Sequence, residues 1–220
     1  MKSFIFLSIG TVAMFVPIFI MMHIYGIKKW KSLPVSVLLT IVGTAGTYIW
    51  FFVESGWFGG RSFYGAVFLV PVVFLWVARW LHISYKQLMD LCGPAECLML
   101  AIMKLMCLSD GCCSGRELFV NAEGIAVYFP SQIVEHINAL IIFAVLMVMV
   151  FRKKNRGCIY PWYLTLYGAT RFVLNFFRLD QAEFFFGMAA GNVWSLVAIV
   201  IGIFWLCICR KKDLTDNPME

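Results

Sequence analysis

Long apolar runs alternate with short polar segments along the whole chain, and there are seven of them. Each run has about 20 residues, the length that a helix needs to cross the hydrocarbon core of a bilayer. Seven membrane-spanning helices are therefore predicted, over residues 4–22, 34–53, 63–82, 88–108, 133–151, 160–177 and 186–209. The longest connection, residues 109–132, is shorter than a separate domain requires. We expect residues 1–220 to form one all-α polytopic membrane domain.

The first run follows Lys2, as the apolar part of a signal peptide would. However, it continues past the length of such a segment and lacks a clear small-residue cleavage site. A retained first helix is the better interpretation.

Composition supports a membrane protein and excludes several other classes. Apolar and aromatic residues make up 62% of the 220 positions and charged residues only 14%, against about a half and a quarter in soluble domains. A soluble fold of this size would expose large apolar patches. Disorder, a secreted disulfide scaffold and a basic nucleic-acid-binding domain are excluded, so the lipid bilayer is an expected partner and nucleic acid is not.

The net charge of +6 is explained by where the basic residues lie. Twelve of the 18 lysines and arginines occupy alternate connections and the C-terminal tail: Lys28, Lys29, Lys31, Arg79, Lys86, Arg152, Lys153, Lys154, Arg156, Arg210, Lys211 and Lys212. Short cytoplasmic loops of membrane proteins carry this excess of basic residues. The N-terminus is therefore predicted outside and the C-terminus in the cytoplasm.

Two cations remain inside predicted helices, Lys104 and Arg171, both toward the outer face. Cations at such depths are costly and usually face a bundle interior, where they pair with an anion. A lipid phosphate would suit both, especially the planar guanidinium. The alternative is that they pair with Glu135, Glu96 or backbone carbonyls, or extend to the interface.

Six segments resemble, in order and spacing, motifs of the prolipoprotein diacylglyceryl transferases of bacterial membranes. They are residues 8–13 (SIGTVA), 59–65 (GGRSFYG), 90–115, 130–135 (PSQIVE), 167–178 (YGATRFVLNFFR) and 191–195 (GNVWS). The resemblance covers most of the chain. It implies seven helices in the bacterial cytoplasmic membrane and a role in lipoprotein biosynthesis.

The resemblance also implies a reaction, the transfer of diacylglyceryl from phosphatidylglycerol to the lipobox cysteine thiol of a lipoprotein precursor. It implies catalytic roles for Tyr64, Lys104 and Arg171. Substrate-binding roles are implied for Gly65, Cys107, Gly115, Ser131, Gln132, Glu135, Asn175 and Arg178. The partners would be phosphatidylglycerol and the precursor, and no metal or organic cofactor is expected.

Several family positions differ here. Tyr64 replaces a histidine, Lys104 an arginine, Phe129 a histidine and Asn175 a glutamate. A phenol with a pKa of about 10 is a poor general base at neutral pH. The alternative function is therefore a non-catalytic paralogue that binds anionic lipid or a lipoprotein precursor. A transporter is less favoured, since no inverted repeat is visible.

Structural roles compete with the functional ones at three places. Tyr64 could be an interfacial aromatic anchor. Ser131 could be the N-cap of the fifth helix, with Gln132 and Glu135 completing the cap. The cysteines do not have zinc-type C-x-x-C spacing, and most are read as apolar filler in helices. Cys107, Cys112 and Cys113 lie near the outer, oxidising face, where a disulfide or a reactive thiol is the alternative.

Overall fold

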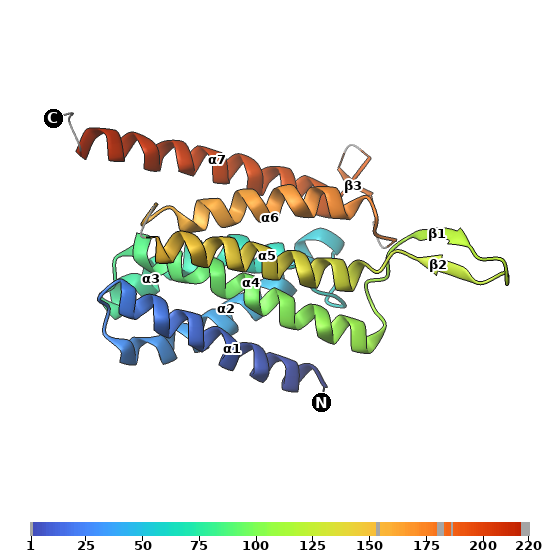
Figure 1. The fold of residues 1–220 in the computed structure, drawn as a ribbon, viewed down its shortest axis with the longest axis horizontal. Coiled ribbons are helices and arrows are strands. Elements are labelled where there is room, and N and C mark those ends of the chain that lie inside the picture. Colours follow the sequence, from blue (N-terminus) through green and yellow to red (C-terminus); the bar gives the residue numbers. More distant parts are fainter. Residues whose placement is uncertain (1, 153–154, 180–182, 186, 217–220) are drawn as a thin grey trace.

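The computed structural model describes residues 2–152, 155–179, 183–185 and 187–216, and this part of the chain is mostly helical. Figure 1 shows its helices side by side in one bundle. They are α1 Lys2–Ile24, α2 Ser32–Ser55, α3 Tyr64–Leu81, α4 Tyr85–Asp110, α5 Ser131–Phe151, α6 Ile159–Asn175 and α7 Ala190–Asp216, with a 3₁₀ turn, η1 Lys29–Lys31, before α2. The first six predicted ranges agree with these helices to within three residues at each end.

Six helices of the described chain, all except α6, have the length and composition to cross a membrane. The exception has 17 residues, which at 1.5 Å per residue is about 25 Å. Large apolar side chains such as Phe4, Val12, Trp76 and Phe204 point away from the protein interior. An outward-facing apolar surface of this kind is stable in lipid and not in water, so the fold is that of a polytopic membrane protein.

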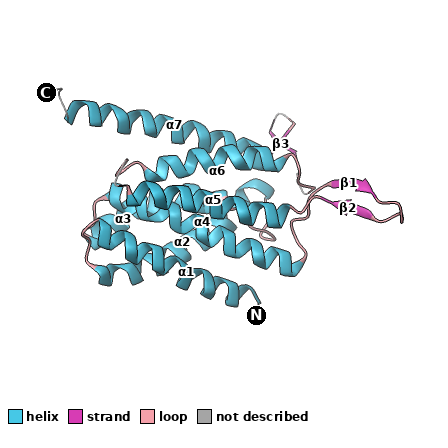
Figure 2. Ribbon diagram, viewed as in Figure 1, coloured by secondary structure: helices cyan, strands magenta, loops and turns pink. Residues whose placement is uncertain are grey.

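The all-α prediction was wrong in two places, where short hairpins form (Figure 2). The connection after α4 contains an antiparallel pair, β1 Glu117–Val120 and β2 Ala126–Tyr128. A second pair, β3 Glu183–Phe185 and β4 Met188–Ala189, precedes α7. The last helix therefore begins at Ala190 and not at residue 186, which lies outside the described residues.

Local turn chemistry explains the first hairpin, although its strands are too short for a clear sequence pattern. The Asn121 side-chain oxygen accepts hydrogen bonds from the backbone N–H groups of Glu123 and Ile125, at 3.0 and 2.8 Å. Gly124 has φ +78°, a conformation that glycine adopts without steric cost. These contacts reverse the chain between the two strands.

Helix α4 is the centre of the bundle, with α1, α3, α5 and α6 packed against it. It is buried more completely than any other candidate membrane span in the described chain. On the α6 side, a Cβ at Gly93 would lie 3.2 Å from the Cβ of Tyr163. The missing side chain lets the two helices approach closely, and this fixes the first half of α6 against the first half of α4.

The two ends of the bundle differ in charge. The basic connections lie at the end where α7 finishes, and the N-terminus and the β1–β2 hairpin lie at the other end (Figure 1). At the basic end, Asp90 of α4 accepts hydrogen bonds from the Tyr25 hydroxyl at 2.7 Å and from the backbone N–H groups of Gly157 and Ile159 at 2.5 and 2.9 Å. This carboxylate therefore joins the end of α1, the start of α4 and the start of α6.

We expect Tyr25→Phe to lower the free energy of unfolding by about 1.5 to 3 kcal/mol, because a hydrogen bond to a charged group is lost. Unfolding in mixed detergent micelles would measure the difference. Tyr128→Phe is the control, since Tyr128 is exposed on β2 and a surface change of this kind alters stability by about 0.5 kcal/mol at most. Equal effects of the two substitutions would contradict the role of Tyr25.

Candidate functional site

Three cations converge on one carboxylate at the end of the bundle opposite the basic connections. Lys104 Nζ lies 2.5 Å from Glu135 Oε2, and Arg171 Nη1 contacts the same oxygen. Arg178 Nη1 donates to Glu135 Oε1 at 2.8 Å. The four side chains are between 5% and 16% exposed, so they form one buried ionic cluster, here called the Glu135 cluster.

Each member of the Glu135 cluster comes from a different segment. Lys104 lies in the last two turns of α4, Glu135 in the first two turns of α5, and Arg171 in the last two turns of α6. Arg178 follows α6, where a β-bridge pairs it with Gly115. The cluster thus depends on the packing of α4, α5 and α6 and on the connection after α4.

The charges in the cluster do not balance. Among the described residues, three cations pair with this one carboxylate, and Glu54 acts on Arg171 only from beyond ion-pair distance. These ion pairs leave the cluster with an excess of buried positive charge. The Nε atom of Arg171 is also buried and has no hydrogen-bond partner among the described residues. Buried N–H donors are normally paired, and a guanidinium suits bidentate binding of a phosphate. The arrangement can accept an additional anion.

The connection after α4 is held against α5 by two side chains for which the resemblance implies substrate binding. Ser131 Oγ donates to the carbonyl oxygen of Cys113, and Gln132 Nε2 donates to that of Cys112 at 2.6 Å. The predicted capping role of Ser131 was wrong, because α5 begins at this residue and has no side-chain cap. Glu135 likewise pairs with cations instead of completing a cap.

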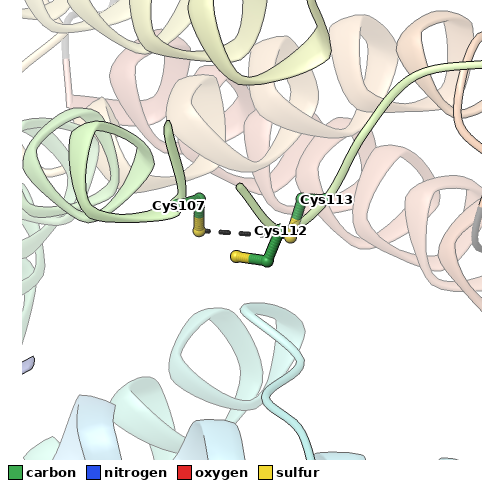
Figure 3. A group of neighbouring side chains, drawn as sticks. All are labelled: Cys107, Cys112 and Cys113. Atoms are coloured by element: carbon green, nitrogen blue, oxygen red, sulfur yellow. Dashed lines mark hydrogen bonds between the residues drawn. The ribbon is translucent and has the colours of Figure 1, made fainter. Parts of the chain in front are cut away.

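Three thiols lie beside this cluster, at the end of α4 and in the connection that follows it (Figure 3). The sulfur atoms of Cys107, Cys112 and Cys113 all lie within 4.8 Å of one another, and those of Cys107 and Cys113 are 4.0 Å apart. None of these three cysteines forms a disulfide. The sequence predicts only that all three lie near the outer face, and the structure shows that their sulfurs converge.

The two thiols beyond the end of α4 differ in their acidity. The hydrogen bond with Cys107 lowers the pKa of the Cys113 thiol, and the charges of Lys104 and Arg178 act in the same direction, against the effect of burial. Burial and the neighbouring Cys113 raise the pKa of the Cys112 thiol. Because a thiolate is the reactive form, Cys113 is the thiol that the cationic surroundings favour as an anion.

Tyr64 is 3% exposed, so the alternative that it is an interfacial anchor was wrong. Its hydroxyl lies 2.5 Å from Ser195 Oγ, which itself donates to the carbonyl oxygen of Gly191 at 2.6 Å. Tyr64 is therefore the donor to Ser195, and its proton is engaged in a link between α3 and α7. The ring of Tyr64 packs against Tyr167 with centroids 5.7 Å apart, one helical turn before Arg171.

The remaining predicted site residues have clear packing environments. A Cβ at Gly65 would collide with the carbonyl oxygen of Gly46, so this glycine lets α2 and α3 approach closely. A Cβ at Gly115 would collide with the carbonyl oxygen of Phe129. Asn175 is 2% exposed and lies against Gly191. Close packing explains these residues, and a role in substrate binding stays a prediction for each.

The sequence offers Glu135, Glu96 and backbone carbonyls as partners for Lys104 and Arg171. The structure pairs both with Glu135 and not with Glu96, which is eight residues before Lys104 on α4, about 12 Å along the helix axis. It also shows Ser195 as the partner of Tyr64, although nothing in the sequence connects these two positions. Arg178 joins the same cluster, and the substrate-binding role that the resemblance implies for it stays a prediction.

Comparisons with known proteins agree with the resemblance. The sequence profile of the family described as prolipoprotein diacylglyceryl transferase matches residues 11–208. Among individual proteins, a phosphatidylglycerol–prolipoprotein diacylglyceryl transferase of Dehalococcoides mccartyi strain 195 is 27% identical over 171 residues, covering 72% of this chain and 65% of that protein.

Two further relatives carry the same name. The protein of Geobacter sulfurreducens is 30% identical over 143 residues, which are 61% of this chain and 54% of that protein. The protein of Proteus mirabilis is 24% identical over 189 residues, which are 71% of this chain and 64% of that protein. The chain thus matches less than two thirds of the length of each of these relatives.

Proposed function

Because the chain belongs to the prolipoprotein diacylglyceryl transferase family, we propose that it transfers a diacylglyceryl group from phosphatidylglycerol to the cysteine thiol of a lipobox in a lipoprotein precursor. In this reaction a carbon–sulfur bond forms at the glyceryl carbon and the carbon–oxygen bond to phosphate breaks. Glycerol phosphate leaves with the electron pair of that bond. The thiol proton passes to solvent or to a base.

The excess positive charge of the Glu135 cluster is the observation that carries this proposal. A leaving phosphate gains negative charge in the transition state, and fixed cations at that position lower the barrier. Arg171 brings an unpaired Nε–H to the site, and Lys104 brings a second charge. We assign phosphate binding to these two residues, with Arg178 and Glu135 holding them in place.

The site is proposed to face outward in a bacterial cytoplasmic membrane. The basic connections at the opposite end of the bundle support this orientation, because such loops remain in the cytoplasm. The N-terminus and the β1–β2 hairpin would then lie outside and the C-terminus inside. The lipobox of a translocated precursor would reach the Glu135 cluster from the outer leaflet.

The alternative is that the chain binds anionic lipid or a lipoprotein precursor without turnover. The hydrogen bond of Tyr64 to Ser195 favours it, because the residue that replaces the family histidine has its proton engaged. A phosphate would still fit among the cations of the Glu135 cluster. The two functions differ in whether a covalent product appears.

The test is transfer in membranes that contain the full chain. A lipobox peptide and phosphatidylglycerol are added, and mass spectrometry follows the peptide. We expect the mass of one diacylglyceryl group to be added at the cysteine, and a peptide with serine at that position should gain none.

A membrane preparation of a known transferase serves as the positive control. If that preparation modifies the peptide and this chain does not, while radiolabelled phosphatidylglycerol still binds to it, the alternative function is correct. Transfer to the cysteine peptide and not to the serine peptide establishes that the chain is the enzyme.

A further inference from the structure

The three thiols beside the Glu135 cluster have a geometry that the transfer reaction, as proposed above, does not explain. Cys107 lies in the last turn of α4, and Cys112 and Cys113 follow directly after that helix. Their sulfurs meet because the chain turns back on itself: Gly111 has φ +65° and Cys113 has φ +60°. A left-handed conformation is rare at a residue other than glycine, so the convergence is specified by the fold.

The segment that carries these thiols is held in place from both sides. Ser131 and Gln132 of α5 donate to the carbonyl oxygens of Cys113 and Cys112. On the other side, the backbone N–H of Arg116 donates to the carbonyl oxygen of Phe177 at 2.9 Å. A ligand set held in this way loses little entropy when it binds a metal ion.

We propose that Cys107, Cys112 and Cys113 bind one Zn²⁺ ion through three thiolates and leave its fourth coordination position open to an incoming cysteine thiol. Zinc–sulfur bonds of about 2.3 Å in tetrahedral geometry place sulfurs about 3.8 Å apart. The three sulfurs lie up to 4.8 Å apart here, so they would have to approach one another by up to about 1 Å to bind the ion. Catalytic zinc sites hold three protein ligands and keep one position free in this manner.

The positive charges near the three thiols favour such a zinc–thiolate complex. Three thiolates and one Zn²⁺ carry a net charge of −1, and Lys104 is three residues before Cys107 on the same face of α4. In the part of the chain that the structure describes, the Glu135 cluster pairs three cations with a single carboxylate. Since Cys112 is exposed and Cys107 and Cys113 are half-buried, both the ion and a thiol can reach the sulfurs.

The open zinc position would activate the substrate thiol, a role that Tyr64 does not fill. This catalytic role rests on the proposed function. A thiol that coordinates zinc is deprotonated. Its proton goes to solvent, its sulfur forms the fourth zinc bond, and no oxidation state changes. The same sulfur would then bond to the glyceryl carbon as glycerol phosphate leaves with its electron pair, and water would replace the thioether on zinc.

Metal binding is tested first, on the full chain in detergent, fully reduced and stripped with a chelator. Cobalt(II) is the spectroscopic probe for zinc, and no lipid or peptide is present. We expect one cobalt ion per chain, with a thiolate-to-cobalt charge-transfer band that zinc abolishes. Cys112→Ser and Cys113→Ser should each weaken binding by at least about 100-fold. Cys207→Ser is the matched control, because Cys207 is an exposed cysteine of α7 outside the cluster.

The fourth position is tested by adding a lipobox peptide to the cobalt-bound protein, again without lipid. The cysteine peptide should shift the cobalt d–d bands, and the serine peptide should leave them unchanged. Absence of cobalt binding by the reduced protein overturns the metal site, as does equal binding by the Cys113→Ser variant. Unchanged bands with the cysteine peptide overturn the open position. Neither readout needs turnover, so a chain that binds zinc and transfers no lipid would overturn only the proposed function.

Discussion

Replacing Arg171 with alanine is expected to reduce diacylglyceryl transfer by about 10²- to 10³-fold, the usual cost of removing one donor that stabilises a developing anion. The guanidinium is the member of the Glu135 cluster with a buried, unpaired Nε–H. Arg171→Lys keeps the charge but loses the planar fork, so we expect an intermediate loss. The measurement is kcat/KM for the lipobox peptide in membranes with phosphatidylglycerol.

Arg61→Ala is the matched control for this comparison. Arg61 is an exposed arginine before α3, and its guanidinium bonds Tyr48 Oη at 2.8 Å. It should keep transfer within a few-fold of the unmodified protein. Unchanged kcat/KM for Arg171→Ala would remove Arg171 from the reaction. A loss confined to the KM for phosphatidylglycerol, measured at a fixed peptide concentration, would place Arg171 in lipid binding alone.

Replacing Glu135 with glutamine should destabilise the fold by at least about 3 to 5 kcal/mol, the cost of removing one partner from a buried ion pair. Here a single carboxylate is the shared partner of Lys104, Arg171 and Arg178, so its loss leaves three mutually repelling cations close together. Unfolding in mixed detergent micelles and the yield of folded protein would report the effect.

A second substitution separates charge from packing. Glu135→Gln combined with Lys104→Gln restores the original net charge of the cluster, and we expect it to recover part of the lost stability. Glu123→Gln, in the exposed turn of the first hairpin, should change stability by about 0.5 kcal/mol at most. If Glu135→Gln behaves like Glu123→Gln, the carboxylate is not what holds the three cations together.

The two predictions probe different properties of one site. Arg171 is proposed to bind the substrate phosphate. Glu135 is proposed to stabilise the folded site, because it neutralises part of the positive charge that binds that phosphate. A site with balanced charges would have little affinity for an anion, and a site without any carboxylate would be unstable. The ratio of three cations to one carboxylate lies between these limits.

Much of the fold was predictable because membrane insertion constrains sequence strongly. A backbone in hydrocarbon must satisfy its hydrogen bonds internally, so seven apolar runs predict helices with accurate ends. The exceptions were the two hairpins and the start of α7. Their strands have two to four residues, which is too short for a recognisable alternation of apolar and polar positions.

The sequence by itself determined which charges are unusual. With only 14% charged residues, Lys104 and Arg171 are conspicuous inside apolar runs, and the motifs around them identify the family. What only the tertiary structure decided is the partners of these side chains: Glu135 for both cations, and Ser195 for Tyr64. Which side chains on different helices meet depends on how each helix is rotated and how deep it lies. Packing between the helices sets both properties, and the sequence pattern of a single helix does not specify them. The convergence of three thiols was decided in the same way, by two left-handed residues after α4.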